Sequence, residues 1–143
     1  MAVPARIGIV TLGVADLDRS IAFYQALGWE RCMSSVEGEI SWFRTADSYL
    51  GLFPYEALAE DARVSSPGRG TFDGITLAIN VERVEDVETV LAEAVAAGAT
   101  LLKGATELPF AVSGYFADVD GYAWEVAYNP SFPIGSDGRI TIP

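Results

Sequence analysis

The sequence predicts an α+β fold in which two tandem β-α-β-β-β modules form a curved, cup-like sheet of eight strands with helices outside. Apolar residues alternate with period two in several short segments and recur at helical spacing in two longer ones. The same order of segments occurs twice, offset by roughly seventy residues. At 143 residues, half of them hydrophobic, the chain suits one domain with a sizeable core.

The first module covers about residues 5–54. Residues 7–14 alternate as a strand, after which Asp16 is a candidate helix N-cap. A helical face of Leu17, Ile21, Tyr24 and Leu27 follows, and Gly28 ends it. Strands at residues 29–36, 39–44 and 49–53 complete the module, joined by turns at residues 37–38 and 46–48.

A linker over about residues 55–73 separates the modules. Residues 55–62 suit a short helix, and the Ser-, Pro- and Gly-rich residues 65–70 suit a flexible connector. We expect this linker to cover part of any cavity that the sheet encloses.

The second module covers about residues 74–129 and repeats the order of the first. A strand at residues 75–81 precedes a helix whose Val84, Val87, Leu91 and Val95 share one face before Gly98. Strands at residues 100–103, 110–117 and 122–128 follow. The proline-rich residues 130–143 suit an extended tail packed over the sheet or over a partner subunit.

Composition restricts the classes of partner. The net charge is −11, which disfavours binding to nucleic acid and to anionic membranes; it supports solubility and can attract cationic ligands. The single cysteine, Cys32, can form no internal disulfide. No targeting segment or membrane-spanning run is visible, so we expect a cytoplasmic protein.

The strand at residues 122–128 carries an isolated carboxylate. Alternation places Trp124 and Val126 on one face and Glu125, between two alanines, on the other. The preceding Asp118 and Gly121 provide the residues of a tight turn. We therefore expect the function of the chain to lie in front of Glu125.

Two motifs in this order resemble the vicinal oxygen chelate superfamily, which includes glyoxalase I, extradiol dioxygenases, fosfomycin-modifying enzymes and bleomycin-resistance proteins. They are IVTLGVADLDRSIAFYQALG at residues 9–28 and DVDGYAWEV at residues 118–126. The resemblance implies paired β-α-β-β-β modules that curl into a cup, and commonly a homodimer.

The resemblance also implies four metal-ligand positions, which fall on Ile9, Gly51, Thr76 and Glu125. Metal-dependent relatives carry His, Glu or Gln there, whereas this chain has no histidine. A transition-metal site needs several converging donors, and only Glu125 matches. We therefore expect no metal and no cofactor, which disfavours glyoxalase or dioxygenase chemistry of the metal-dependent kind.

A cup without a metal suits a small organic molecule, either cationic or aromatic. The expected ligand-binding residues are Ile9, Thr11, Trp42, Tyr49, Gly51, Phe53, Thr76, Ala78, Tyr115 and Glu125. The inward orientation of Trp42 and Tyr115 depends most on strand register.

Two alternatives to a binding protein stay open. In a metal-independent lyase or isomerase, Glu125 is the general base and Tyr115 a candidate partner acid. In an interaction domain, the cup is closed by its own side chains.

Overall fold

The computed structural model describes residue 3 and residues 5–65, 68–70 and 72–143, which form three helices and seven strands in two sheets. The predicted α+β class is confirmed. The chain divides into two compact units, Met1–Pro67 and Gly68–Pro143. Each unit has its own sheet and its own helical cover.

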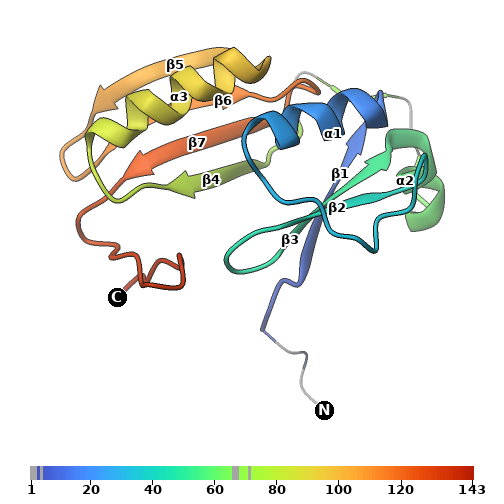
Figure 1. Ribbon diagram of the computed structural model, residues 1–143, viewed down its shortest axis with the longest axis horizontal. Coiled ribbons are helices and arrows are strands. Elements are labelled where there is room, and N and C mark those ends of the chain that lie inside the picture. Colours follow the sequence, from blue (N-terminus) through green and yellow to red (C-terminus); the bar gives the residue numbers. More distant parts are fainter. Residues whose placement is uncertain (1–2, 4, 66–67, 71) are drawn as a thin grey trace. The chain divides into compact units, whose positions relative to one another are not determined.

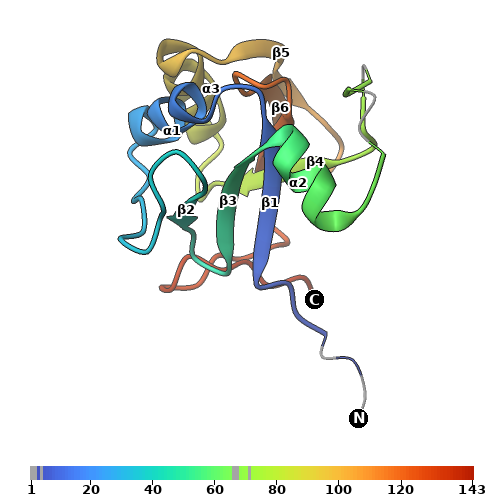
Figure 2. The same cartoon turned by 90° about the vertical axis from the view of Figure 1, so that its right-hand side faces the viewer.

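Unit 1 consists of β1 (Ile9–Val14), α1 (Leu17–Ala26), β2 (Ser41–Arg44), β3 (Tyr49–Pro54) and α2 (Tyr55–Ala62). Its strands are ordered β1-β3-β2, with β1 parallel and β2 antiparallel to the central β3 (Figure 2). The short helix predicted after the last strand is α2.

Helix α1 begins and ends where the sequence predicts. The carboxylate of Asp16 accepts a hydrogen bond from the backbone N–H of Arg19, and Gly28 follows the helix with a φ of 86°. The buried face of α1 includes Tyr24, whose ring centroid lies 5.8 Å from that of Phe43 in β2. Helix α1 therefore covers the face of the sheet that carries Phe43, Leu50 and Leu52.

The strand predicted at residues 29–36 is not regular, which leaves seven strands instead of eight in the described residues. The segment forms one isolated bridge with β2, between Arg31 and Phe43, and a second bridge between Val36 and Ile40. The hydroxyl oxygen of Ser35 accepts a hydrogen bond from the backbone N–H of Trp42 at 2.9 Å, and the N–H of Ser35 bonds back to Cys32. A side chain and a local turn thus take hydrogen bonds that a continuous ladder would use.

Unit 2 consists of β4 (Thr76–Asn80), α3 (Glu85–Ala97), β5 (Thr100–Glu107), β6 (Val112–Ala117) and β7 (Ala123–Tyr128). The order is β4-β7-β6-β5, and α3 lies along one face of this sheet (Figure 1). Strand β4 runs parallel to β7, just as β1 runs parallel to β3. The first and last strands of each unit are therefore neighbours, as expected for a repeated module.

Helix α3 packs on its sheet through Val87, Leu91 and Ala94, all of them buried. The prediction that Val84 and Val95 belong to this face is wrong, since their exposed fractions are 48% and 45%. Positions 87, 91 and 94 follow the spacing i, i+4, i+7, which gives a narrower apolar stripe than predicted.

The C-terminal tail folds back on itself after β7. Ile134 forms a bridge with Ile140, and Gly138 occupies the turn between them with a φ of 83°. Among the described residues, no helix has the length and apolar character of a membrane span.

Candidate functional site

Glu125 lies in the middle of β7, directly after a tight turn. One carboxylate oxygen of Asp118 accepts hydrogen bonds from the N–H groups of Asp120 and Tyr122, each at 2.9 Å. Gly121 has a φ of 87° and donates its N–H to the carbonyl of Asp118. The reversal predicted from Asp118 and Gly121 is confirmed, and it fixes where β7 begins.

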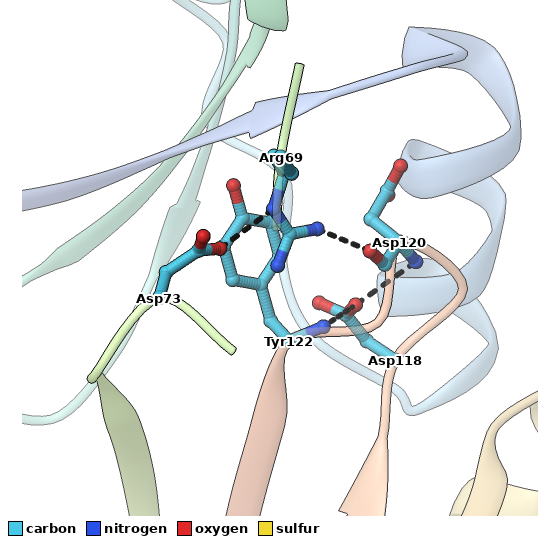
Figure 3. Close-up of polar contacts among 5 residues, drawn as sticks. All are labelled: Arg69, Asp73, Asp118, Asp120 and Tyr122. Atoms are coloured by element: carbon cyan, nitrogen blue, oxygen red, sulfur yellow. Dashed lines mark hydrogen bonds and ion pairs between the residues drawn. The ribbon is translucent and has the colours of Figure 1, made fainter. Parts of the chain in front are cut away.

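Arg69, which lies just before β4 in the sequence, contacts the turn at residues 118–122 (Figure 3). Its guanidinium carbon lies 3.6 Å from the centroid of the Tyr122 ring, its Nε donates to the Asp73 carboxylate at 2.8 Å, and a terminal nitrogen donates to the carbonyl of Asp120. Planar stacking combined with several directed hydrogen bonds suits arginine better than lysine. Part of the predicted flexible connector is therefore held against the start of β7.

Arg69 was missed by the sequence reasoning, which treated its surroundings as a connector. Arg69 forms an ion pair with Asp73, four residues further along the chain. The contact with Tyr122 spans 53 positions of the chain and has no local signal in the sequence. Burial raises the pKa of the Tyr122 phenol, an effect that the charge of Arg69 opposes.

The side chains of unit 2 that point away from α3 form what we call the Glu125 face. They are Thr76, Ala78, Asn80, Thr100, Lys103, Thr106, Ser113, Tyr115, Ala117, Ala123, Glu125 and Ala127. Strand pairing places Ala78, Glu125 and Tyr115 in one row across β4, β7 and β6. The predicted ligand-binding residues of unit 2 therefore lie together, with Thr76 diagonal to Glu125.

Tyr115 and Glu125 are direct cross-strand neighbours in the antiparallel pair β6–β7. Burial, the negative charge of Glu125 and a hydrogen bond from the phenol to that carboxylate together raise the pKa of Tyr115. The phenol therefore stays protonated at neutral pH and acts as a donor to Glu125. Both side chains are partly exposed, so the pair is accessible on this face.

In unit 1, the side chains on the opposite side of the sheet from α1 form the Gly51 face. Thr11, Gly51 and Trp42 make one row across β1, β3 and β2. A Cβ atom on Gly51 would lie 2.9 Å from the Thr11 hydroxyl oxygen and 3.4 Å from the Trp42 ring. The two neighbours therefore close over the position that Gly51 leaves without a side chain.

Adjacent rows of the Gly51 face hold Ile9 with Tyr49, and Gly13 with Phe53. A Cβ on Gly13 would lie 2.9 Å from the ring of Tyr55, so α2 covers this end of the face. At the other end lies Arg44, which precedes the β2–β3 turn and was not among the predicted site residues.

Arg44 donates a hydrogen bond to the Tyr49 hydroxyl at 2.9 Å. Its guanidinium carbon also lies 5.5 Å from the centroid of the Tyr49 ring. The register that places Arg44 opposite Tyr49 depends on the length of the turn between them, which the sequence predicted in outline only.

The four implied metal-ligand positions do not provide a donor set. Ile9 and Gly51 of unit 1 offer no side-chain donor, and in unit 2 the Glu125 carboxylate is accompanied only by the Thr76 hydroxyl. In the parts of the chain that the structure describes, no group of three or more His, Cys, Asp or Glu side chains is placed to hold a metal ion. The residues at these positions do not fit a transition metal.

A separate hollow of about 410 Å³ lies between the tail and the ends of β4 and β7. Its walls include Glu82, Tyr128 and Phe132, and it shares no residue with the predicted ligand-binding set. The turn at Gly135–Gly138 shapes one side of it. The tail thus borders a concavity at the edge of unit 2, away from Glu125 in the strand.

Comparison with known proteins assigns the family. The family model described as Glyoxalase/Bleomycin resistance protein/Dioxygenase superfamily matches residues 6–126. The chain belongs to this superfamily, which confirms the resemblance drawn from its two motifs. No curated protein gave a match.

Solved structures agree with this assignment. A glyoxalase-related enzyme from Fulvimarina pelagi is 33% identical, with a TM-score of 0.86, over 96% of this chain and 98% of that one. A glyoxalase/bleomycin resistance protein/dioxygenase family enzyme from Burkholderia phytofirmans PsJN is 23% identical, with a TM-score of 0.78, over 87% and 99% of the two chains. A lactoylglutathione lyase from Agrobacterium tumefaciens is 22% identical, with a TM-score of 0.66, over 87% and 94%. The last two comparisons bear on the fold alone.

Proposed function

We propose that this protein binds a small organic molecule with a cationic or aromatic group on its Glu125 face, without a metal ion. The observation that carries the proposal is the direct cross-strand pairing of Tyr115 with Glu125 among small neighbours. Apart from Tyr115, the nearest neighbours of Glu125 on this face are Ala78, Ala123 and Ala127, whose side chains are single methyl groups. The carboxylate and the phenol therefore extend beyond them. A carboxylate recognises a cation, and the Tyr115 ring adds a stacking surface.

The side chains at the family's metal-ligand positions disfavour a bound metal ion. The chain contains no histidine, and the family's ligand positions retain one carboxylate and one hydroxyl. Addition of zinc, nickel or manganese should therefore leave the thermal midpoint unchanged, as should a chelator. A stoichiometric metal retained through purification would contradict this part of the proposal.

Ligand binding is tested by thermal shift and calorimetry with benzylamine and benzyltrimethylammonium as probes. A ligand at a hundred times its Kd stabilises the folded state by about 2.7 kcal/mol, which raises the midpoint by several degrees. We expect Glu125→Gln to abolish this shift and Glu107→Gln, an equal change of charge at an exposed position of β5, to retain it. No shift with either probe, or the same shift in Glu125→Gln, would count against the proposal.

A second candidate is a metal-independent lyase or isomerase. The cross-strand pairing of Tyr115 with Glu125 favours it, because a carboxylate base and a protonated phenol then stand side by side. The Fulvimarina pelagi relative, described as an enzyme, adds weight at 33% identity. For a substrate found by screening, Glu125→Gln should abolish turnover and Tyr115→Phe should reduce it, while both variants stay folded.

We also propose that the protein is a homodimer, as the family resemblance implies. Light scattering should give about twice the chain mass of 15.3 kDa. A mass of a single chain at micromolar concentration would contradict this.

A further inference from the structure

The only lysine of the chain, Lys103, lies in β5 directly opposite Tyr115 of β6. The chain otherwise uses arginine for its positive charges and carries a net charge of −11. A single ammonium group in such a chain therefore stands next to the pair of Tyr115 and Glu125.

A β-bulge aims Lys103 at this face. Leu101 pairs with Phe116, whose side chain is buried on the α3 side, whereas Lys103 pairs with the next residue of β6, Tyr115. Two residues of β5 thus correspond to one step of β6, and Leu102 is the extra residue. In a regular strand, residues 101 and 103 would share a face; the bulge turns Lys103 to the opposite one.

The result is a row of four side chains across the sheet: Lys103 of β5, Tyr115 of β6, Glu125 of β7 and Ala78 of β4. Neighbouring strands lie about 4.8 Å apart, so the backbones of Lys103 and Glu125 are about 10 Å apart with the phenol between them. The ion pairs among the described residues involve neither Lys103 nor Glu125. An ammonium and a carboxylate therefore stand on either side of an aromatic hydroxyl, and neither charge is neutralised by one of these ion pairs.

We propose that the Glu125 face selects zwitterionic ligands, with the ligand's ammonium at Glu125 and its carboxylate at Lys103. This inference rests on the proposed function and names the class of ligand for the same site. The order of charges across the row fixes the orientation of the ligand, and the Tyr115 ring lies beneath the part that joins the two charged groups. An aromatic or extended spacer fits that distance better than the single carbon of an α-amino acid.

The competing explanation is that Lys103 protects an edge strand. Strand β5 is at the edge of its sheet, where lysine discourages pairing with another chain. Such a role requires a charge at the edge but gives no reason for the charge to be turned to the side of Glu125. The two explanations differ in ligand preference, which only the zwitterion site predicts.

Isothermal titration calorimetry with three probes of one shape tests the inference: 4-(aminomethyl)benzoate, 4-methylbenzylamine and 4-methylbenzoate. We expect the wild-type protein to bind the zwitterion roughly fivefold more tightly than the amine, the upper range for an exposed ion pair, and the anion more weakly than either. In Lys103→Met, the ratio between zwitterion and amine should fall to about one. Arg83→Gln removes an equal charge at a residue paired with Asp86 of α3 and should keep the wild-type ratio.

Each failure has its own signature. If the amine binds and the wild-type ratio is one, or if Lys103→Met keeps the preference, the zwitterion site is wrong and the proposed binding of cations stands. If neither amine nor zwitterion binds, the proposed function fails and the inference fails with it. Increased aggregation of Lys103→Met with an unchanged ratio would assign Lys103 to edge protection and overturn the inference.

Discussion

Single residues decide what chemistry each unit retains. In unit 1, Gly51 stands at one implied metal-ligand position, and the side chains of Thr11 and Trp42 close over it. In unit 2, Glu125 provides a carboxylate at such a position, directly opposite Tyr115 in the neighbouring strand. Unit 1 therefore has packed side chains at that position, while unit 2 has a carboxylate beside a neutral phenol. The second arrangement is the one with a reactive or binding group to offer.

The titration of Tyr115 reports directly on this pair. Two of the three causes that raise its pKa, the charge of Glu125 and the hydrogen bond to it, disappear in Glu125→Gln. The pKa of Tyr115 should therefore fall toward the usual value of about 10. Alkaline titration followed by NMR of ring-labelled tyrosine measures it, with Tyr122 as an internal control because its raised pKa has other causes.

The same shift predicts how stability depends on pH. The folded protein holds the Tyr115 proton more tightly than the unfolded chain, so this contribution is complete below the unfolded pKa of about 10. It is lost as pH rises through the higher pKa of the folded state. Wild type and Tyr115→Phe should therefore converge in unfolding free energy above pH 10. A difference that is constant with pH would contradict the raised pKa of Tyr115.

At the scale of elements, the sequence predicted which helices and strands form, and in what order, better than it predicted their regularity and register. Helix α1 begins after Asp16 and ends before Gly28, because capping residues are local signals. Residues 29–36 do not form a regular strand, because the Ser35 hydroxyl accepts the hydrogen bond of the Trp42 N–H in place of a backbone carbonyl. Strand propensities of single residues do not include this competition. The bulge at Leu102 is also invisible in the sequence, since Leu101-Leu102-Lys103 reads equally well as regular alternation. The sequence analysis assigned no face to Lys103, and only the register of β5 with β6 shows that it lies opposite Tyr115.

The packing of α3 on its sheet depends on a glycine in β6. A Cβ on Gly114 would lie 2.6 Å from a Leu91 methyl group of α3 and 2.7 Å from the backbone oxygen of Lys103. Because backbone cannot yield as a flexible side chain can, we expect Gly114→Ala to lower the free energy of unfolding by about 1–3 kcal/mol. Chemical denaturation measures this loss.

Gly104 in β5 provides the matched control, since a Cβ there would meet no atom within 4 Å. Gly104→Ala should leave the unfolding free energy close to that of the wild type. Equal stability of the two variants would mean that α3 and β5 shift apart at little cost. The close approach of helix and strand would then not be needed for the fold.

At the scale of the whole molecule, the repeat was the most predictable feature. Aligning the two halves anticipated that the first strand of each unit occupies the same place relative to the last, and β1–β3 and β4–β7 both pair in parallel. Hydrophobic periodicity survives divergence because each unit must bury its own helix. The contacts of Arg69 and Arg44 could not be anticipated in this way, because they join positions whose proximity depends on turns and register.

The net charge of −11 gives the whole chain a measurable response to salt. Eleven of the twenty acidic residues and three of the nine basic residues lie in residues 71–143, so repulsion is concentrated there. Raising ionic strength from about 0.01 M to 0.15 M shortens the Debye length from about 30 Å to about 8 Å. We expect the thermal midpoint to rise by about 2–4 °C, equivalent to about 1 kcal/mol for a chain of this size.

A charge variant separates this repulsion from general effects of salt. Glu93→Gln with Glu107→Gln removes two exposed acids, one on α3 and one on β5, that take part in none of the ion pairs among the described residues. At low salt the double variant should melt above the wild type, and its further gain on adding salt should be smaller, because less repulsion is left to screen. A midpoint that falls with salt would show that ion pairs such as Arg83 with Asp86 outweigh the repulsion. In that case the few cations of the chain would stabilise the fold through their pairs with acidic residues.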